Sequence, residues 1–141
     1  MCEAWGEPIA YDGTSYYSFP SVERLSRLTQ EDWAILHAGY RVPSLMDAAT
    51  KLSLPEFSAS QLKTLSYPEV FKKLQEIHGV GPKVAACVAL FGLGYFEAFP
   101  IDVWIKRAMA ELFPNGLPEN ILPFAGIAQQ YIFHYIRTRI S

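Results

Sequence analysis

One short break in an otherwise helical stretch constrains this chain more than any other feature: the sequence HGVGP at residues 78–82. Before it, the apolar spacing of residues 68–77 predicts a helix, and after it Pro82 opens a second helical pattern, KVAACVALFGLG. Two glycines around one apolar residue allow positive φ and a sharp reversal of the chain. We therefore expect a helix–hairpin–helix over residues 68–94, with Val80 pointing inward to pin the turn.

The hairpin also predicts a kind of ligand. The backbone amides of Gly79, Val80 and Gly81, with those at the start of the next helix, would face outward with the positive end of a helix dipole behind them. Such an array binds phosphate and reads a DNA backbone without reading its sequence. A plain turn between two helices with glycine caps is the alternative that the same residues allow.

Helical patterns dominate the remaining chain, whereas strand-like alternation is weak. Short amphipathic stretches follow residues that favour helix N-caps, namely Ser21, Thr29, Ser60, Ser66 and Asp102. The apolar spacing of residues 124–139 predicts a last helix. We expect an all-α fold, built as one irregular multi-helix domain over residues 1–141 rather than as a regular bundle.

The first six residues, MCEAWG, resemble the final turn of a helix that ends at a glycine. Because a domain seldom begins on such a turn, we expect the chain to be N-terminally truncated.

Composition narrows the function classes. Half of the 141 residues are hydrophobic and the formal net charge is −2, which argues against a protein that grips nucleic acid by bulk charge but leaves room for a local basic patch. Two cysteines and three scattered histidines indicate neither a disulfide framework nor a metal site. No signal peptide or membrane-length apolar run is present, so we expect a cytoplasmic protein.

Lys83 and Cys87 give the second helix of the hairpin a chemical interest. A lysine in the first turn faces the positive end of the helix dipole, which with partial burial favours the neutral amine that a lysine nucleophile needs. Cys87 lies four residues on, hence on the same helical face, where a small polarizable thiol could line a pocket for a flat base. Ordinary core packing is the simpler interpretation of Cys87 alone.

Asp102, in the segment FPIDVWIKRA, is the candidate acidic partner. Its position before a helical pattern predicts a plain N-cap. The same carboxylate, ionised at neutral pH, could stabilise a developing positive charge or steer the nucleophile.

These residues resemble a known family. The pattern L-x-x-I-x-G-V-G-P-K-V-A-x-C, with P-I-D-V placing Asp102 nineteen residues after Lys83, resembles the helix–hairpin–helix DNA glycosylases with a Gly/Pro-rich loop and an aspartate, the HhH-GPD superfamily. Within it, the chain looks most like the 8-oxoguanine DNA glycosylases. The segments TSYYSFPSVERL, LHAGYR and AGIAQQYIF resemble further family segments in the same order.

The resemblance implies a base-excision repair enzyme, a bifunctional glycosylase and abasic-site lyase that acts on duplex DNA containing 8-oxoguanine or an abasic site, as a monomer. Lys83 and Asp102 would be catalytic. Cys87 and Phe133 would stack on the two faces of the flipped base, while Gln129 would bond its Watson–Crick edge. No cofactor is required, although an alkali cation could bind at the hairpin.

The remaining implied contacts are to the DNA. Tyr40 would wedge into the stack and Arg41 would contact the orphaned cytosine. Gly79, Val80 and Gly81 would lie along the phosphates, and Trp104 takes the place where many members carry a phosphate-contacting histidine.

The chain departs from the family pattern elsewhere. The N-terminal sheet domain and asparagine-rich motif of full-length members have no counterpart here, and His78 stands where proline is frequent. Two alternatives therefore stay open: a non-catalytic helix–hairpin–helix DNA-binding fragment, and a lyase for a different oxidised base.

Overall fold

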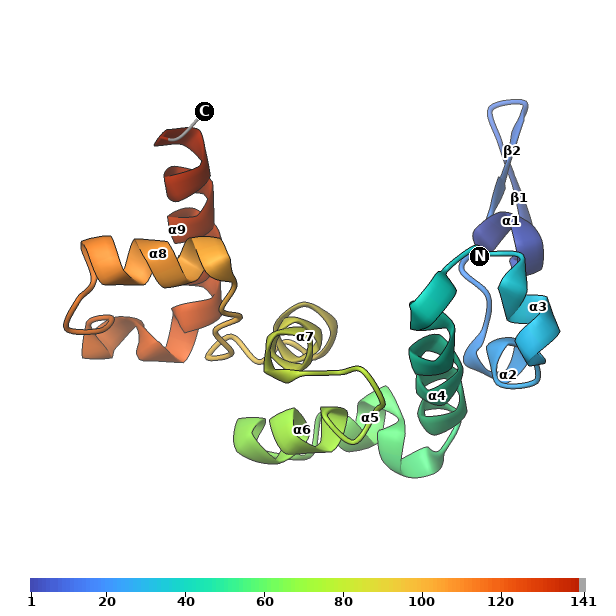
Figure 1. The fold of residues 1–141 in the computed structure, drawn as a ribbon, viewed down its shortest axis with the longest axis horizontal. Helices are drawn as coiled ribbons and strands as arrows, with labels where there is room; N and C mark the ends of the chain where they lie inside the picture. The colour runs from blue at the N-terminus through green and yellow to red at the C-terminus, as the bar shows by residue number, and fades with distance from the viewer. Residues whose placement is uncertain (140–141) are drawn as a thin grey trace. The chain divides into compact units, whose positions relative to one another are not determined.

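The structure is a computed structural model, and it describes residues 1–139 (Figure 1). Within that range the chain divides into two compact units, Met1–Gln61 with Ile77–Gly79, and Leu62–Glu76 with the residues from Val80 onward. Helices make up most of both units, which confirms the all-α class.

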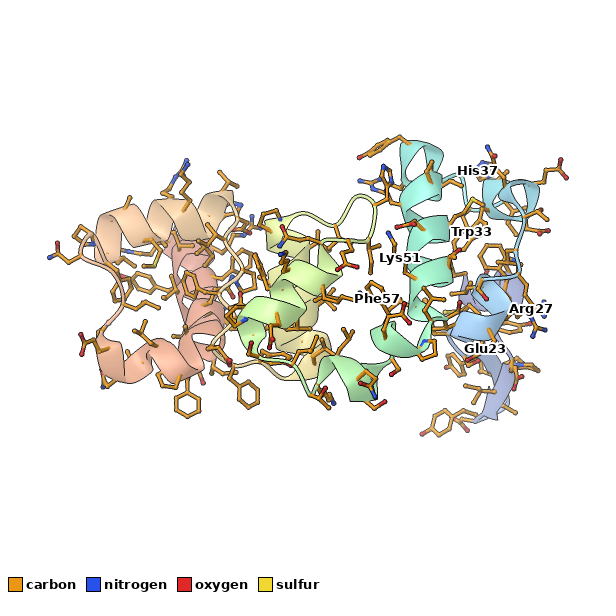
Figure 2. The ribbon with its side chains drawn as sticks, turned by 90° about the horizontal axis from the view of Figure 1, so that it is seen from below. Glu23, Arg27, Trp33, His37, Lys51 and Phe57 are labelled. Atoms are coloured by element: carbon orange, nitrogen blue, oxygen red, sulfur yellow. The ribbon has the colours of Figure 1, made fainter. Side chains whose placement is uncertain are left out.

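Unit 1 is built from short helices and one hairpin of strands. Its elements are α1 (Cys2–Trp5), β1 (Pro8–Tyr11), β2 (Thr14–Tyr17), α2 (Val22–Leu25), α3 (Gln30–Ala34), η1 (Gly39–Arg41), α4 (Val42–Leu52) and η2 (Pro55–Phe57), and α5 (Ala59–Leu62) lies at the boundary. Trp5 and Trp33 meet edge to face in its core, with ring centroids 5.1 Å apart. Trp33 is only 1% exposed (Figure 2), as its apolar surroundings in the sequence predict.

Unit 2 holds the hairpin of helices and the C-terminal pair. Its elements are α6 (Tyr67–Leu74), α7 (Pro82–Cys87), the π-helical turn η3 (Val88–Leu93), α8 (Val103–Leu112), η4 (Glu119–Phe124) and α9 (Ala125–Arg139). One apolar cluster joins α6 to α7 and η3, and a second joins α8 to α9. Val80 packs against the first cluster, which confirms that it points inward.

Local capping follows the sequence closely. The Ser21 hydroxyl accepts from the backbone N–H of Arg24, and Thr29 forms a reciprocal capping box with Asp32. The prediction for Ser60 is wrong. α5 begins at Ala59, so Ser60 lies inside the helix, and Ser58 is the residue whose hydroxyl accepts from the N–H of Gln61.

The strands β1 and β2 were not expected. They pair antiparallel, with Pro8 opposite Tyr17 and Tyr11 opposite Thr14. Asp12 and Gly13 connect them with φ of 47° and 70°, the two positive values that a two-residue type I′ turn requires. All eight strand residues are exposed, so no alternation of polar and apolar residues marked the strands. The Asp-Gly pair was the signal that could have revealed them.

The expected final turn at the N-terminus is present as α1, but its glycine has another purpose. Gly6 is extended, at φ −79° and ψ 165°, and does not adopt the left-handed cap. A Cβ at this position would overlap the carbonyl oxygen of Ser18, where the chain returns from β2. Glycine is therefore required here for close backbone approach.

The second helix of the hairpin changes character midway. The sequence predicted one continuous helix after Pro82, whereas the α-helical turns end at Cys87 and a π-helical segment continues to Leu93. Gly94 then ends it at φ 83°, in the left-handed region. No helix among residues 1–139 combines the length and the apolar character needed to cross a membrane.

Candidate active site

Lys83 lies in the first turn of α7. Gly81 is the N-cap, Pro82 follows it, and the N–H of Ala85 donates to the carbonyl of Gly81 at 2.9 Å. No side chain caps this helix start in the described part of the chain, so the amides of Lys83 and Val84 stay available to a ligand. Lys83 itself is exposed rather than partly buried as expected, because the residues that pack into the core from α7 are Ala85 and Ala86.

A small cavity adjoins Lys83. Its volume is about 160 Å³, and its walls are Tyr67, Phe71, Pro82, Lys83, Ala86, Phe99 and Ile101. Burial, aided by the nearby carboxylate of Glu97, raises the pKa of Tyr67 above its usual 10. The tyrosine is therefore a neutral hydroxyl at physiological pH. Lys83 is the one cation on an otherwise uncharged, largely aromatic wall.

Asp102 is the N-cap of α8, as its sequence position predicts. Its Oδ1 accepts from the backbone N–H of Trp104 at 3.0 Å and of Ile105 at 2.8 Å. Within residues 1–139 no donor bonds its Oδ2. The carboxylate is thus fixed through one oxygen, and its second oxygen is left for a ligand.

The segment Phe99–Asp102 links the candidate groups of unit 2. Phe99 and Ile101 line the cavity at Lys83, and the next residue after Ile101 is Asp102. The carbonyl of Pro100 accepts from Gln129 Nε2 at 3.0 Å. Sequence reasoning missed Phe99 and Pro100, although their position just before Asp102 was a usable signal.

The three residues predicted to hold a flipped base take separate places. Gln129 is 6% exposed, and its amide is occupied at both ends, by the Pro100 carbonyl and by the Gln130 side chain. Phe133 lies one turn further along α9 and is half-buried against the α8–α9 core. Cys87 is half-buried at the end of α7. None of the three lines the cavity at Lys83 as described over residues 1–139.

The first half of the hairpin loop is braced from α4, within unit 1. The backbone N–H of His78 donates to Asp47 Oδ2 at 2.6 Å, and a hydrogen bond of 3.1 Å joins Ser44 Oγ to His78 Nδ1. The His78 N–H, with help from Lys51, lowers the pKa of Asp47 below its usual 3.8. Gly79 follows at φ 79°. Ser44 and Asp47 were missed because they lie more than thirty residues from the loop, where no local pattern connects them.

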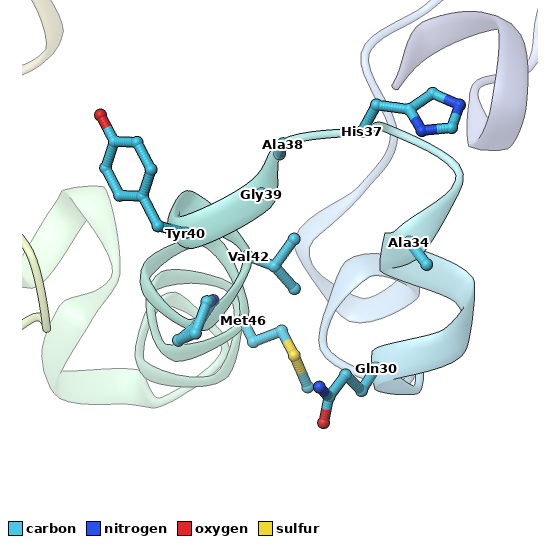
Figure 3. A pocket seen from close by; sticks show the side chains of 9 residues that line it. Gln30, Ala34, His37, Ala38, Gly39, Tyr40, Val42 and Met46 are labelled. Atoms are coloured by element: carbon cyan, nitrogen blue, oxygen red, sulfur yellow. The ribbon is translucent and has the colours of Figure 1, made fainter.

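Tyr40 and Arg41 form η1, also in unit 1. Tyr40 is 82% exposed, and the Arg41 guanidinium lies 4.9 Å from the centroid of its ring. Figure 3 shows Tyr40 projecting at the rim of a cavity of about 820 Å³, which lies between α3 and the start of α4. Such exposure of a large aromatic ring contributes little to a core and suits a side chain that contacts a partner.

Trp104, the remaining predicted contact, lies in the first turn of α8 and is half-buried. Two arginines approach its ring, Arg107 at 5.3 Å and Arg137 at 5.0 Å from the centroid. Among residues 1–139, no three His, Cys, Asp or Glu side chains gather in a way that could hold a metal ion.

An all-α chain with this helix–hairpin–helix, a lysine on the first turn after the hairpin and an N-capping aspartate on α8 has the architecture of the helix–hairpin–helix DNA glycosylases. Comparison with known proteins agrees. The chain is 35% identical, over 88% of its length, to the Arabidopsis thaliana N-glycosylase/DNA lyase OGG1, and it covers 36% of that protein. It is 28% identical, over 94% of its length, to a probable N-glycosylase/DNA lyase of Methanothermobacter thermautotrophicus, of which it covers 52%.

A solved structure gives the same result. The Clostridium acetobutylicum 8-oxoguanine glycosylase/lyase, in complex with double-stranded DNA containing cytosine opposite 8-oxoguanine, matches 99% of this chain with a TM-score of 0.84 and 33% identity, and the match covers 52% of that protein. The chain belongs to the 8-oxoguanine glycosylase family of N-glycosylase/DNA lyases. It spans about half the length of these relatives or less. No family model matches the chain.

Proposed function

We propose that this chain carries the catalytic site of a bifunctional DNA glycosylase and abasic-site lyase that removes 8-oxoguanine from duplex DNA. The observation that carries the proposal is Lys83: an exposed amine on the first turn after the hairpin, on the wall of a cavity whose other side leads directly into Asp102. The family relationship supplies the substrate class.

The proposed chemistry begins with the Lys83 amine attacking C1′ of the damaged nucleotide. The bond from C1′ to the base breaks, and its electron pair leaves with the base, which takes up a proton. Ring opening then gives an iminium between Lys83 and C1′. Loss of a proton from C2′ with cleavage of the C3′–O3′ bond nicks the strand by β-elimination. The free Oδ2 of Asp102 faces the step in which positive charge develops on the sugar.

The base pocket needs a rearrangement in this proposal. Gln129 already spends both ends of its amide on Pro100 and Gln130, so bonding a base edge requires an exchange of partners. An exchange of hydrogen bonds costs little where each bond lost is replaced. Cys87 and Phe133 would then stack on the base. Flipping costs a few kcal/mol, which these contacts and the Tyr40 wedge must offset.

We further propose the DNA contacts that position the strand. The amides of Gly79, Val80 and Gly81 would bond phosphates, with an alkali cation at the same turn, and Trp104 would lie beside the strand. Arg41 would contact the cytosine opposite the lesion.

Borohydride trapping tests the function. Reduction of the iminium would join the chain covalently to a duplex containing 8-oxoguanine opposite cytosine, and to one with an abasic site. We expect both adducts, and expect Lys83→Gln to abolish them while Lys72→Gln, an exposed lysine of α6, leaves them unchanged. Binding to the abasic duplex without an adduct from the natural chain would instead identify a non-catalytic DNA-binding fragment.

The lesion itself needs a separate measurement, because the amide of Gln129 is not yet free to read a base edge. Excision from duplexes that differ only in the oxidised base should be fastest for 8-oxoguanine. A different base excised faster by the same Lys83-dependent reaction would keep the lyase chemistry and change the substrate.

A further inference from the structure

Trp104 stands among basic side chains that the proposed chemistry does not use. Arg107, from the next turn of α8, and Arg137, from α9, both place their guanidinium carbon about 5 Å from the centre of its ring. At this distance each cation is attracted by the electrons of the indole ring. One aromatic ring therefore holds two positive charges near each other, against their mutual repulsion.

The positive charge is local to this pair of helices. α8 and α9 together carry four basic residues, Lys106, Arg107, Arg137 and Arg139, against one acidic residue, Glu111, which gives a net charge of +3. The whole chain has a net charge of −2, so all other residues together carry −5. A surface of this sign on an acidic protein selects anionic partners.

Not all four basic groups are equally available. Arg139 forms an ion pair with Glu111, at 3.5 Å. No ion pair within residues 1–139 includes Arg107, which is exposed. The unneutralised charge is therefore concentrated on the Trp104 side of the helix pair, in the first two turns of α8.

The geometry favours phosphate over other anions. A guanidinium held by an aromatic ring is restrained before any ligand arrives, so less side-chain entropy is lost on binding. Its five N–H donors lie in one plane and match the oxygens of a phosphate in a bidentate arrangement. Trp104 is two residues from Asp102, so a phosphate bound here would lie within about one helical turn of the candidate catalytic carboxylate.

We propose that Arg107 and Arg137, restrained by Trp104, form a phosphodiester-binding site that holds the DNA strand beside Asp102 without reading its sequence. The proposal rests on the proposed function for the identity of the polymer. Because the contact is to the backbone, it acts equally on damaged and undamaged duplexes.

The salt dependence of DNA binding tests this site. Affinity for an undamaged duplex is measured at several salt concentrations in the Lys83→Gln background, where no chemistry occurs. Each phosphate contact contributes about 0.9 to the slope of log K against log salt concentration. We expect Arg107→Gln and Arg137→Gln each to reduce the slope by about 1, and Arg107→Lys to retain it. Arg139→Gln, the same charge change on α9, should leave the slope unchanged because Glu111 already pairs with Arg139.

Unchanged slopes in Arg107→Gln and Arg137→Gln, with lowered urea midpoints, would overturn the proposal and leave the arginines a purely structural role. An equal reduction by Arg139→Gln would also overturn it, since general charge would then explain the effect. Trapping by the natural chain reports on the proposed function independently. Failure to trap with the predicted slopes would leave the phosphate site intact as part of a non-catalytic module.

Discussion

Gly79→Ala tests how the hairpin is held in place. The residue has φ 79°, a region that costs a residue with a Cβ about 1–2 kcal/mol. The new Cβ would also overlap Ser44 Oγ and lie 2.9 Å from Ser44 Cβ. Rotating the hydroxyl away breaks its bond to His78, worth about 0.5–1.5 kcal/mol. We therefore expect a total loss of about 3 kcal/mol.

A second substitution separates these two contributions. In a Ser44→Gly background both clashing atoms are absent, so adding Gly79→Ala should cost only the backbone strain, about 1–2 kcal/mol. Urea unfolding of the four variants, followed by the fluorescence of Trp5 and Trp33 in the core of unit 1, measures the coupling. An equal loss in both backgrounds would refute the contact between Ser44 and the hairpin as the reason for glycine at this position.

Three further outcomes follow from the same contacts. Because its pKa is lowered in the folded state, Asp47 contributes stability that is present above pH 4 and lost as the pH falls below the usual 3.8; Asp47→Asn, partly exposed, should cost about 1 kcal/mol at pH 7 and flatten this acid limb in urea titrations. Tyr40→Ala should leave the urea midpoint within about 0.5 kcal/mol of the natural value, because its ring is 82% exposed, while lowering excision or trapping rates; unchanged rates would remove it from the DNA contact. Gln129→Ala should lose about 1–3 kcal/mol of stability by leaving the buried Pro100 carbonyl without its partner, and equal stability would contradict the bond.

Much of the local structure could be predicted from the sequence, because it depends on neighbours. The capping box of Thr29 and Asp32 and the N-cap Asp102 involve residues two or three positions apart. Val80 was predicted inward for the same reason: a single apolar residue between two glycines has one way to be buried. The strands around Asp12 escaped because both faces are exposed and no alternation marks them.

The arrangement of the site could not be predicted in the same way. The bond from Gln129 to Pro100 spans 29 residues, and the bond from His78 to Asp47 spans 31, so both depend on how distant elements pack. Sequence alone could place Lys83 on a helix start, but not show that Tyr67 and Phe99 form its wall. The same holds for Trp104, whose two arginines come from different helices.

Mapping the covalent adduct tests the central claim most directly. The natural chain is reduced with borohydride on an abasic-site duplex, digested, and the modified peptide is sequenced by mass spectrometry. We predict that the sugar remnant is attached to Lys83, in the peptide that follows HGVGP. Attachment to another lysine or to the N-terminal amine, or an adduct of undiminished yield from Lys83→Gln, would contradict the assignment of Lys83 as the nucleophile.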